Sequence, residues 1–285
     1  MTKRNHRLAI FLLVLPAVGY VALFLGATLT MTLLQSFGFF SFGTETNVGA
    51  QAWVSVLNDQ QMWDSFWYSA KIASASAFAA LLIAYPLALY LRNSFFAKGL
   101  TNALLRVPLF VPALVATFLI LNILSFHGIV NEVLILLGLI REPFRLTHDP
   151  SGVVVIAIQI WKNLPFQTLI LAAVLVNIPR DLEAAARNLG AGPFGVFRHV
   201  LLPLSIPGVV TGVVLVFIGV FGDFAVNSIA GPVYPVSLSI RMYLLGHTFG
   251  EWGQAGVIAI VIMVASMLFA WVFSRMAKML ARYVG

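Results

Sequence analysis

Six long runs of apolar residues alternate with short polar segments along the chain. A helix needs roughly 20 predominantly apolar residues to cross the hydrocarbon core of a membrane, and each run reaches that length. Because a membrane leaves helices and closed barrels as the only spanning structures, this pattern predicts an all-α, polytopic membrane helix bundle of about six transmembrane helices. The predicted spans are Leu8–Leu34, Ser65–Leu91, Ala103–Phe126, Gly152–Val176, Leu204–Val226 and Gly253–Ser274.

Two apolar stretches need a separate interpretation. Ile129–Ile140 is too short to cross a membrane, and we interpret it as an interfacial or re-entrant helix. The N-terminal run follows three cations, as in a signal peptide, but it is too long for one and lacks a clear cleavage site of small residues. We therefore expect a retained anchor, and we expect residues 1–285 to form a single transmembrane domain.

Composition agrees with this pattern and excludes several kinds of chemistry. The chain is 60% hydrophobic and only 9% charged, whereas about a quarter of the residues in soluble domains are charged. It has no cysteine, no phosphate-binding loop of the G-x-x-x-x-G-K-[ST] type, no H-E-x-x-H and no G-x-S-x-G. Its histidines show no metal-ligand spacing. We therefore expect neither an enzyme nor a metal site.

The cations orient the predicted helices. The net charge is +7, but the cations are scattered at span ends rather than gathered into a stripe that would suit nucleic acid. One side carries Lys3, Arg4, Arg7, Arg92, Lys98, Arg106, Arg180, Arg187, Arg198, Arg275, Lys278 and Arg282. The other carries only Arg141, Arg145 and Arg241. Because cytoplasmic loops are enriched in Lys and Arg, we predict that both termini and the loop at 177–207 are cytoplasmic.

That loop is longer than a simple connector needs to be. Pro179 suits a helix start, and the acidic residues that follow suit a first turn. Gly190 suits a helix C-terminus because glycine tolerates left-handed backbone geometry. Pro193 then opens a second segment, Phe194–Val200. The loop is therefore predicted to form two short helices that dock into a groove of another protein.

These residues resemble the cytoplasmic EAA loop of binding-protein-dependent ABC importer permeases. The family pattern is Glu-Ala-Ala, three residues, Gly, nine residues, Ile, any residue and Leu-Pro. Gly190, Val200 and Leu202-Pro203 match its second half, with Val in place of Ile. Ala184 stands at the Glu position and Glu183 is one residue early; since one helical residue turns a side chain by about 100°, we expect Glu183 to complement the helix N-terminus instead. The coupling residues that the resemblance implies are Glu183, Ala184, Ala185, Ala186, Gly190, Ala191, Phe194, Phe197, Leu202 and Pro203.

Three further stretches are similar to the same family. Trp161-Lys162-Asn163-Leu164-Pro165-Phe166 is similar to the W-x-x-x-P-F of its fourth span, and Tyr85-Pro86-Leu87-Ala88 to the G-Y-P-L-A-Y of its second, with Ala84 in place of Gly. Phe221-Gly222-Asp223-Phe224, followed by Ala230-Gly231-Pro232, resembles the end of span five in the polyamine, ferric-ion and phosphonate-related branch.

The resemblance implies a permease subunit in the bacterial inner membrane. Two permeases, identical or different, pair around a solute path, and each docks its EAA loop on a cytoplasmic ABC ATPase subunit. ATP and Mg²⁺ belong to that ATPase, so no cofactor is expected in this chain. An extracytoplasmic binding protein delivers the solute, which by this branch is small and polar or charged, with a polyamine-like molecule as the leading candidate. An ion-gradient-driven secondary transporter or channel is the alternative.

Ionisable groups at membrane depth are candidates for the solute path. They are Lys71, Lys162 and Asp223, and we add Trp161 and Asn163 because they flank Lys162. Either Asp223 pairs with one of the lysines, or each group extends outward to the membrane surface, or one or more of them line the path. An unpaired Asp223 on the path favours a cationic solute, and an unpaired Lys162 favours an anionic one; the residues alone leave this open.

Overall fold

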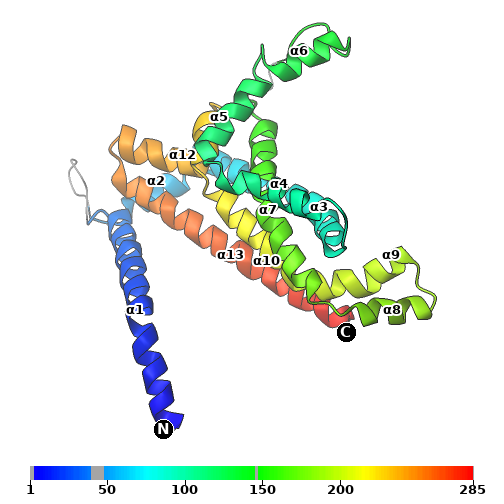
Figure 1. The fold of residues 1–285 in the computed structure, drawn as a ribbon. Helices are drawn as coiled ribbons and strands as arrows, with labels where there is room; N and C mark the ends of the chain where they lie inside the picture. Colours follow the sequence, from blue (N-terminus) through cyan, green and yellow to red (C-terminus); the bar gives the residue numbers. More distant parts are fainter. Residues whose placement is uncertain (1–2, 40–47, 145–146, 285) are drawn as a thin grey trace. The chain divides into compact units, whose positions relative to one another are not determined.

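All regular secondary structure in the described part of the chain is helical (Figure 1). The computed structural model describes the backbone of residues 3–39, 48–144 and 147–284, and the side chains of 13–39, 48–144 and 147–279. Arg145, one of the predicted outer cations, lies outside these ranges, as do the side chains of Lys3, Arg4, Arg7 and Arg282. The segments long and apolar enough to span a membrane are Leu13–Ser36, Gln60–Arg92, Ala113–Leu136, Val153–Val176, Pro193–Phe221 and Trp252–Met279. The predicted all-α architecture with six candidate spans is confirmed.

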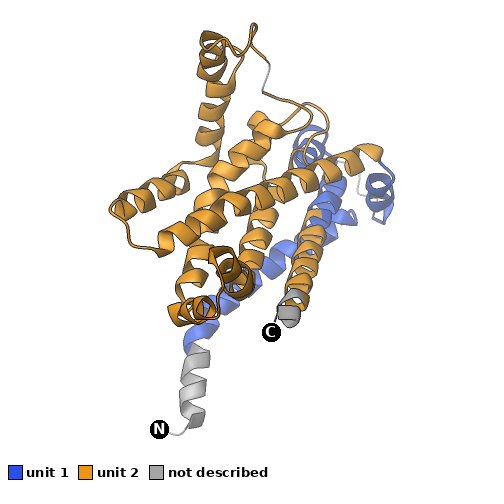
Figure 2. Ribbon diagram, turned by 90° about the vertical axis from the view of Figure 1, so that its right-hand side faces the viewer, with its two compact units in different colours: residues 1–59, 241–261 blue, residues 60–240, 262–285 orange. Residues whose placement is uncertain are grey.

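The chain divides into two compact units (Figure 2). The first unit comprises residues 1–59 and 241–261, and the second comprises 60–240 and 262–285. The prediction of one permease domain concerns the whole chain, and it stays a prediction.

The first unit joins the end of one long helix to the start of another. It contains α1 (Lys3–Ser36), α2 (Gln51–Leu57), η2 (Leu244–Thr248) and the first residues of α13 (Trp252–Val284). The indole Nε1 of Trp53 donates to Ser36 Oγ at 3.2 Å. A Cβ on Gly256 would lie 3.1 Å from the backbone nitrogen of Ser36, so a side chain here would push this close backbone contact apart slightly. Arg241 and Asp59 form an ion pair in the same unit.

The core of the second unit is made by three helices, α3 (Gln60–Arg92), α7 (Val153–Val176) and α10 (Leu202–Phe221). Small side chains on α3 are fully buried where these helices meet, and they recur at helical spacing. They are Ala73, Ala77, Ala80, Ala84 and Ala88. In a membrane, where lipid is as apolar as the helices themselves, small residues favour association because they let backbones approach closely. These three helices therefore form the scaffold that carries the rest of the unit.

The third predicted span, Ala103–Phe126, is wrong in its bounds: the helix is interrupted, and the segment long and apolar enough to span is Ala113–Leu136. The structure has α4 (Lys98–Phe110), α5 (Ala113–Leu124) and α6 (Ile129–Leu136) in this region. Val111 is extended, with ψ of 120°, between α4 and α5. The cause is Pro112, since a proline disfavours the helical conformation of the residue before it. The short helix predicted at Ile129–Ile140 is present as α6 but ends at Leu136; its interfacial or re-entrant position stays a prediction.

The fifth predicted span ends too late. We expected one helix through Val226, but α10 ends at Phe221 and Val226 belongs to a separate short helix, α11 (Ala225–Ala230). Gly222 ends α10, and Asp223 lies in the interruption between the two helices. The chain then continues to α12 (Leu238–Tyr243). A charged residue that was predicted inside a continuous span is thus located at a helix break.

Candidate functional site

The predicted pair of short helices is present. They are α8 (Arg180–Asn188) and α9 (Pro193–Val196), and the π-helical turn η1 (Phe197–Leu201) continues α9 into α10; together they form the coupling hairpin of residues 180–201 (Figure 1). Gly190 has φ of +89°, and a Cβ there would meet nothing within 4 Å. Glycine is therefore needed at this turn for backbone conformation and not for space. The predicted left-handed break at Gly190 is confirmed.

The base of the hairpin is packed against the scaffold helices. Val196 and Leu201 belong to one buried cluster with residues of α3 and α7, among them Ala84, Tyr85 and Leu171. The ring of Phe197 meets that of Tyr85 edge to face at 5.6 Å, and Tyr85 Oη and Ser205 Oγ share a hydrogen bond of 2.6 Å. Phe197 therefore faces inward, although the resemblance counts it among the coupling residues.

An arginine joins the hairpin to the last turn of α3. Arg92 donates to the Glu183 carboxylate and to the carbonyl oxygen of Ile178, and its own carbonyl accepts from Arg180 at 3.2 Å. The side chains of Arg92 and Glu183 are only 8% and 16% exposed. Glu183 lies in the first turn of α8 as predicted, but sequence reasoning missed its partner. A cation at the end of predicted span two was the available signal.

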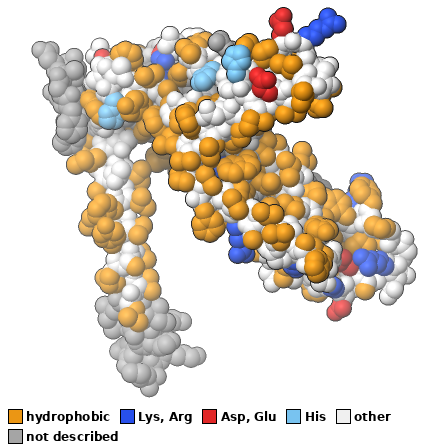
Figure 3. All heavy atoms as spheres, turned by 45° about the horizontal axis from the view of Figure 1, so that its top comes forward, with side chains coloured by type: hydrophobic (Ala, Val, Ile, Leu, Met, Phe, Trp, Pro, Cys, Tyr) orange, Lys and Arg blue, Asp and Glu red, His pale blue; other side chains and the backbone are white. Residues whose placement is uncertain are grey.

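The outer side of the hairpin is apolar at its tip. Leu189 is 90% exposed and Phe194 is 71% exposed. Ala184 and Ala185 are also exposed, whereas Ala186 and Ala191 pack against the buried cluster at the base. In the view of Figure 3, charged side chains gather at this end of the second unit and the middle is largely apolar. Large exposed apolar side chains beside charges are typical of a protein interface.

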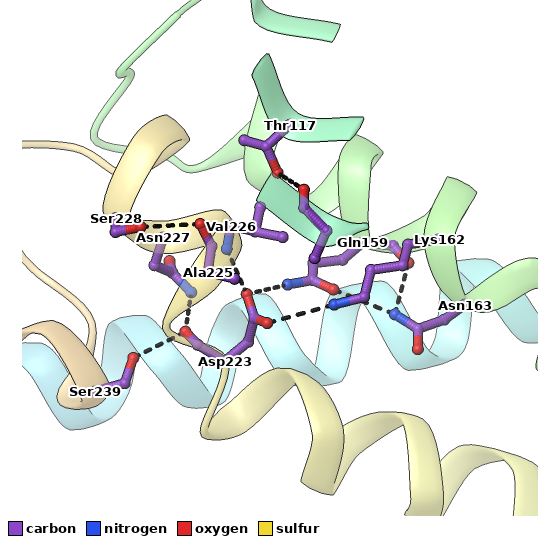
Figure 4. A network of polar contacts seen from close by, with 11 residues as sticks. Thr117, Gln159, Lys162, Asn163, Asp223, Ala225, Val226, Asn227, Ser228 and Ser239 are labelled. Atoms are coloured by element: carbon purple, nitrogen blue, oxygen red, sulfur yellow. Dashed lines mark hydrogen bonds and ion pairs between the residues drawn. The ribbon is translucent and has the colours of Figure 1, made fainter. Parts of the chain in front are cut away.

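A polar network surrounds Asp223 at the break between α10 and α11 (Figure 4). Asp223 Oδ2 accepts from Gln159 Nε2 and from the backbone N–H of Val226, each at 2.9 Å. Asp223 Oδ1 lies 3.4 Å from Lys162 Nζ. The carbonyl oxygen of Asp223 accepts from Asn227 and Ser239, each at 2.8 Å. The structure therefore pairs Asp223 with Lys162, one of the two lysines proposed from the sequence.

The helix break explains why this network forms. Where a helix stops, its last carbonyls and the first N–H groups of the next helix have no partners within a helix, and a membrane makes unpaired groups costly. The Asp223 carboxylate accepts from the N–H of Val226 in the first turn of α11. The side-chain amide of Gln159 donates to the Asp223 carboxylate, and that of Asn227 donates to the Asp223 carbonyl. Gln159 is three residues before Lys162, so the two share a helix face. That spacing was the signal for Gln159, which sequence reasoning missed.

The other three proposed path residues lie in different surroundings, and only Asn163 has a hydrogen bond to the network. Asn163 donates to the carbonyl and side-chain oxygens of Gln159, at 2.8 and 3.2 Å, and so extends the network. Trp161 is exposed on the same helix. Lys71 stays apart: it is exposed, 5.8 Å above the Tyr68 ring, and lines a shallow pocket of about 400 Å³ with Asp64.

Asp149 accepts hydrogen bonds at the N-terminus of α7, the helix that carries Gln159 and Lys162. It accepts from the hydroxyl of Ser151 and from the backbone N–H of Val153, which opens α7. Burial alone would raise the pKa of Asp149, but these hydrogen bonds favour the carboxylate and hold the pKa below its usual 3.8. Among the described residues, no group of three or more His, Asp or Glu side chains could hold a metal ion.

The hairpin and the network both fall within one stretch that matches a known family. The model of the family described as "Binding-protein-dependent transport system inner membrane component" matches residues 76–284. The chain belongs to this family. The protein is therefore the permease component of an ABC importer and a multi-pass protein of the inner membrane.

The curated relatives of the permease are named for different solutes. The permease is 29% identical over 224 residues to the spermidine/putrescine transport system permease protein PotB of Escherichia coli, covering 77% of this chain and 81% of that protein. It is 30% identical over 235 residues to the molybdenum transport system permease protein ModB of Haemophilus influenzae, covering 74% and 95%. The named relatives are transport permeases, and none is named as an enzyme.

Solved structures share the fold of the permease. A bacterial alginate ABC transporter in complex with an alginate pentasaccharide-bound periplasmic protein matches with a TM-score of 0.82 at 16% identity, over 97% of this chain and 96% of that one. The MetNI methionine ABC transporter, in an inward-facing conformation, matches with a TM-score of 0.57 at 17% identity, over 78% and 99%. At these identities the likeness concerns the fold alone.

Proposed function

We propose that the permease moves a polyamine-like cation into the cytoplasm, driven by a separate ATPase that docks on the coupling hairpin. It works beside a second permease subunit, identical or different, and receives the solute from an extracytoplasmic binding protein. ATP and Mg²⁺ belong to the ATPase, and this chain holds no cofactor. The observation that carries the proposal is the hairpin, whose tip is exposed and apolar and whose base is clamped to α3.

The geometry of the hairpin suits the transmission of force. Its tip offers Leu189 and Phe194 to a partner, an arrangement that a groove in another protein would bury. Its base is fixed by Arg92 and by the packing of Phe197 on Tyr85. A displacement of the tip is therefore passed to the scaffold helices instead of being absorbed by a flexible loop.

The class of solute is supported by two observations. Relatives named for spermidine and putrescine cover 77% of the chain, and an acidic side chain, Asp223, lies at the helix break that directly follows the fifth candidate span. Because Asp223 is paired with Lys162 through a single contact of 3.4 Å, this support for a cation depends on the solute replacing that lysine. Membership in the importer family leaves the alternative, an ion-gradient-driven carrier or channel, without support.

Reconstitution tests this function directly. The complete transporter, with both permease subunits, the ATPase and the binding protein, is placed in proteoliposomes and supplied with labelled spermidine or putrescine. We expect uptake that requires internal ATP and external binding protein and that persists when ionophores dissipate ion gradients. Uptake that follows an ion gradient without ATP would contradict the proposal.

The cytoplasmic position of the hairpin and of both termini has its own test. Twelve of the fifteen cations assigned from the sequence lie on one side of the predicted membrane. Reporter fusions after Gly49 and Glu142 should therefore report outside, and those after Lys98, Arg187 and the C-terminus should report inside. An inside signal at Glu142 would refute the third or fourth span.

A further inference from the structure

The position of Asp223 does not depend on Lys162. Its Oδ2 is fixed by Gln159 and by the N–H of Val226, both at 2.9 Å, and its backbone carbonyl by Asn227 and Ser239. These four donors come from α7, α11 and α12 (Figure 4). The carboxylate therefore stays in place whatever cation stands in front of Oδ1.

Lys162 is held much less firmly than its partner. Its contact with Oδ1 is 3.4 Å, longer than an ordinary charge-assisted hydrogen bond. Its side chain is 30% exposed, whereas that of Asp223 is 10% exposed. A flexible, partly exposed lysine can swing away from a rigid carboxylate with the loss of one weak contact.

Membrane depth restricts where Lys162 can turn. It is the tenth residue of α7, roughly 14 Å from the start of that helix at 1.5 Å per residue. A cation that faces lipid at such depth is costly, and ionisable residues in spans face the bundle interior or a water-filled cavity. The exposed part of Lys162 therefore belongs to a surface that a partner subunit or a solute path covers.

The chemistry of the displaced group indicates what can replace it. A lysine side chain ends in a primary ammonium on four carbons, which is the aminobutyl group found at the end of putrescine and spermidine. We propose that Lys162 is a tethered stand-in for the solute: its ammonium occupies an alkylammonium subsite on Asp223 between transport cycles, and the terminal ammonium of the solute displaces it. This inference rests on the proposed polyamine-like solute.

The exchange of the Lys162 ammonium for that of the solute also favours the later release of the solute from Asp223. Without solute, the pair leaves the site neutral, which limits the cost of Asp223 at membrane depth. With solute bound, two ammonium groups lie near one carboxylate and repel each other. Binding that is strong enough for entry and weak enough for exit is what a transport path needs.

A small amine probes the subsite without the binding protein, which would otherwise dominate the apparent affinity. The purified complex of both permease subunits and the ATPase is titrated with n-butylammonium at constant ionic strength, and binding is followed by thermal shift. We expect Lys162→Met to bind n-butylammonium about tenfold more tightly than wild type, because the competing cation is gone. Lys162→Met combined with Asp223→Asn should lose this gain.

Matched controls separate the subsite from general effects. Lys98→Met removes the same charge at the start of α4 and should bind as wild type does. Tetramethylammonium, a cation without an N–H donor, should not distinguish Lys162→Met from wild type. If Lys162→Met is too unstable to purify, Lys162→Arg serves instead: its guanidinium can hold both carboxylate oxygens, and we expect at least threefold weaker binding of n-butylammonium than in wild type.

The outcomes distinguish this inference from the proposed function. Equal affinity of wild type, Lys162→Met and Lys162→Arg for n-butylammonium would overturn the inference, even if spermidine is transported. A gain in Lys162→Met that survives Asp223→Asn would overturn it as well. If the expected pattern appears but the complete transporter carries neither spermidine nor putrescine, the alkylammonium subsite stands and the polyamine proposal fails.

Discussion

The hairpin base and the Asp223 network each contain an ion pair, but the two pairs are built differently. At the hairpin, Arg92 binds both Glu183 and a backbone carbonyl, and both charged side chains are largely buried. In the network, Lys162 reaches Asp223 through one contact of 3.4 Å and stays partly exposed. Arginine suits the first role because its planar fork makes several bonds at once, and lysine suits the second because it is a point charge on a flexible stem.

The difference indicates a division of labour within the permease. Under the proposed function, the hairpin transmits movement from an ATPase and must not yield at its base, whereas Lys162 contacts a passing solute and must be able to release Asp223. Variants in the hairpin and in the network test this comparison.

The largest effect is expected at the hairpin turn. Gly190→Trp forces a bulky side chain onto a backbone with φ of +89°, which costs about 1–2 kcal/mol and misdirects both short helices. We expect normal membrane insertion but loss of ATPase association and at least a hundredfold loss of uptake. The measurements are co-purification and uptake at equal expression.

A pair of smaller changes separates backbone strain from bulk. A Cβ on either Gly190 or Gly192 would meet open space, but Gly192 has φ of −69°. Gly190→Ala should therefore reduce ATPase association and Gly192→Ala should not. Equal behaviour of the two alanine variants would refute the role assigned to the left-handed turn.

The second effect concerns the clamp. Arg92→Ala leaves the carbonyl of Ile178 without this donor and leaves Glu183 with only the longer, more exposed contact to Arg187 at 3.8 Å. Removing one member of a largely buried pair costs about 3 kcal/mol. Lys162→Ala should cost clearly less, on the order of 1 kcal/mol, because its contact is longer and more exposed. Chemical denaturation in detergent measures both.

A double variant provides the control for the clamp. Since Glu183→Ala removes the carboxylate that loses its shorter ion pair in Arg92→Ala, the two changes together should cost less than their sum. Additive losses would show that the pair is not coupled. Glu183→Ala alone should be clearly destabilising, more so than its contribution to the helix N-terminus, about 0.3–1 kcal/mol, would suggest.

The third effect concerns the network. Asp223→Asn keeps the size of the side chain and an oxygen for the N–H of Val226, but it removes the charge that Lys162 faces. We expect intact insertion, roughly 1–2 kcal/mol of destabilisation and about a tenfold loss of uptake. Glu132→Gln, an exposed change in α6, is the control, and uptake equal to that of the control would remove Asp223 from the path.

The smallest effect is at the start of α7. Because the pKa of Asp149 is lowered in the folded protein, its contribution is complete above its unfolded pKa and is lost as pH falls through the folded pKa. Asp149→Asn should therefore cost about 0.5–1 kcal/mol near neutral pH and nothing measurable once the wild-type carboxylate is protonated. A difference in stability that is the same near neutral pH and in acid strong enough to protonate the carboxylate would contradict this assignment.

The apolar pattern and the loop chemistry determined much of the permease by themselves. Runs of roughly 20 or more apolar residues leave little choice but a spanning helix, so the number of spans follows from the sequence. Proline at a helix start and glycine at a turn act within a few residues, and for this reason the coupling hairpin and the left-handed Gly190 could be predicted. The interruption at Pro112 was also readable, since its effect on Val111 is local, but the apolar run concealed it.

Only the tertiary structure decided which charges meet. Arg92 and Glu183 are 91 residues apart, and Lys162 and Asp223 are 61 residues apart; no local rule brings such residues together. The sequence offered Lys71 and Lys162 equally as partners of Asp223. The choice was made by the packing of α3, α7 and α10 and by the end of α10 at Gly222, which places Asp223 in front of Gln159 and Lys162. The cost of an unpaired group in a membrane requires that such a group find a partner, but three-dimensional packing determines which partner is within reach.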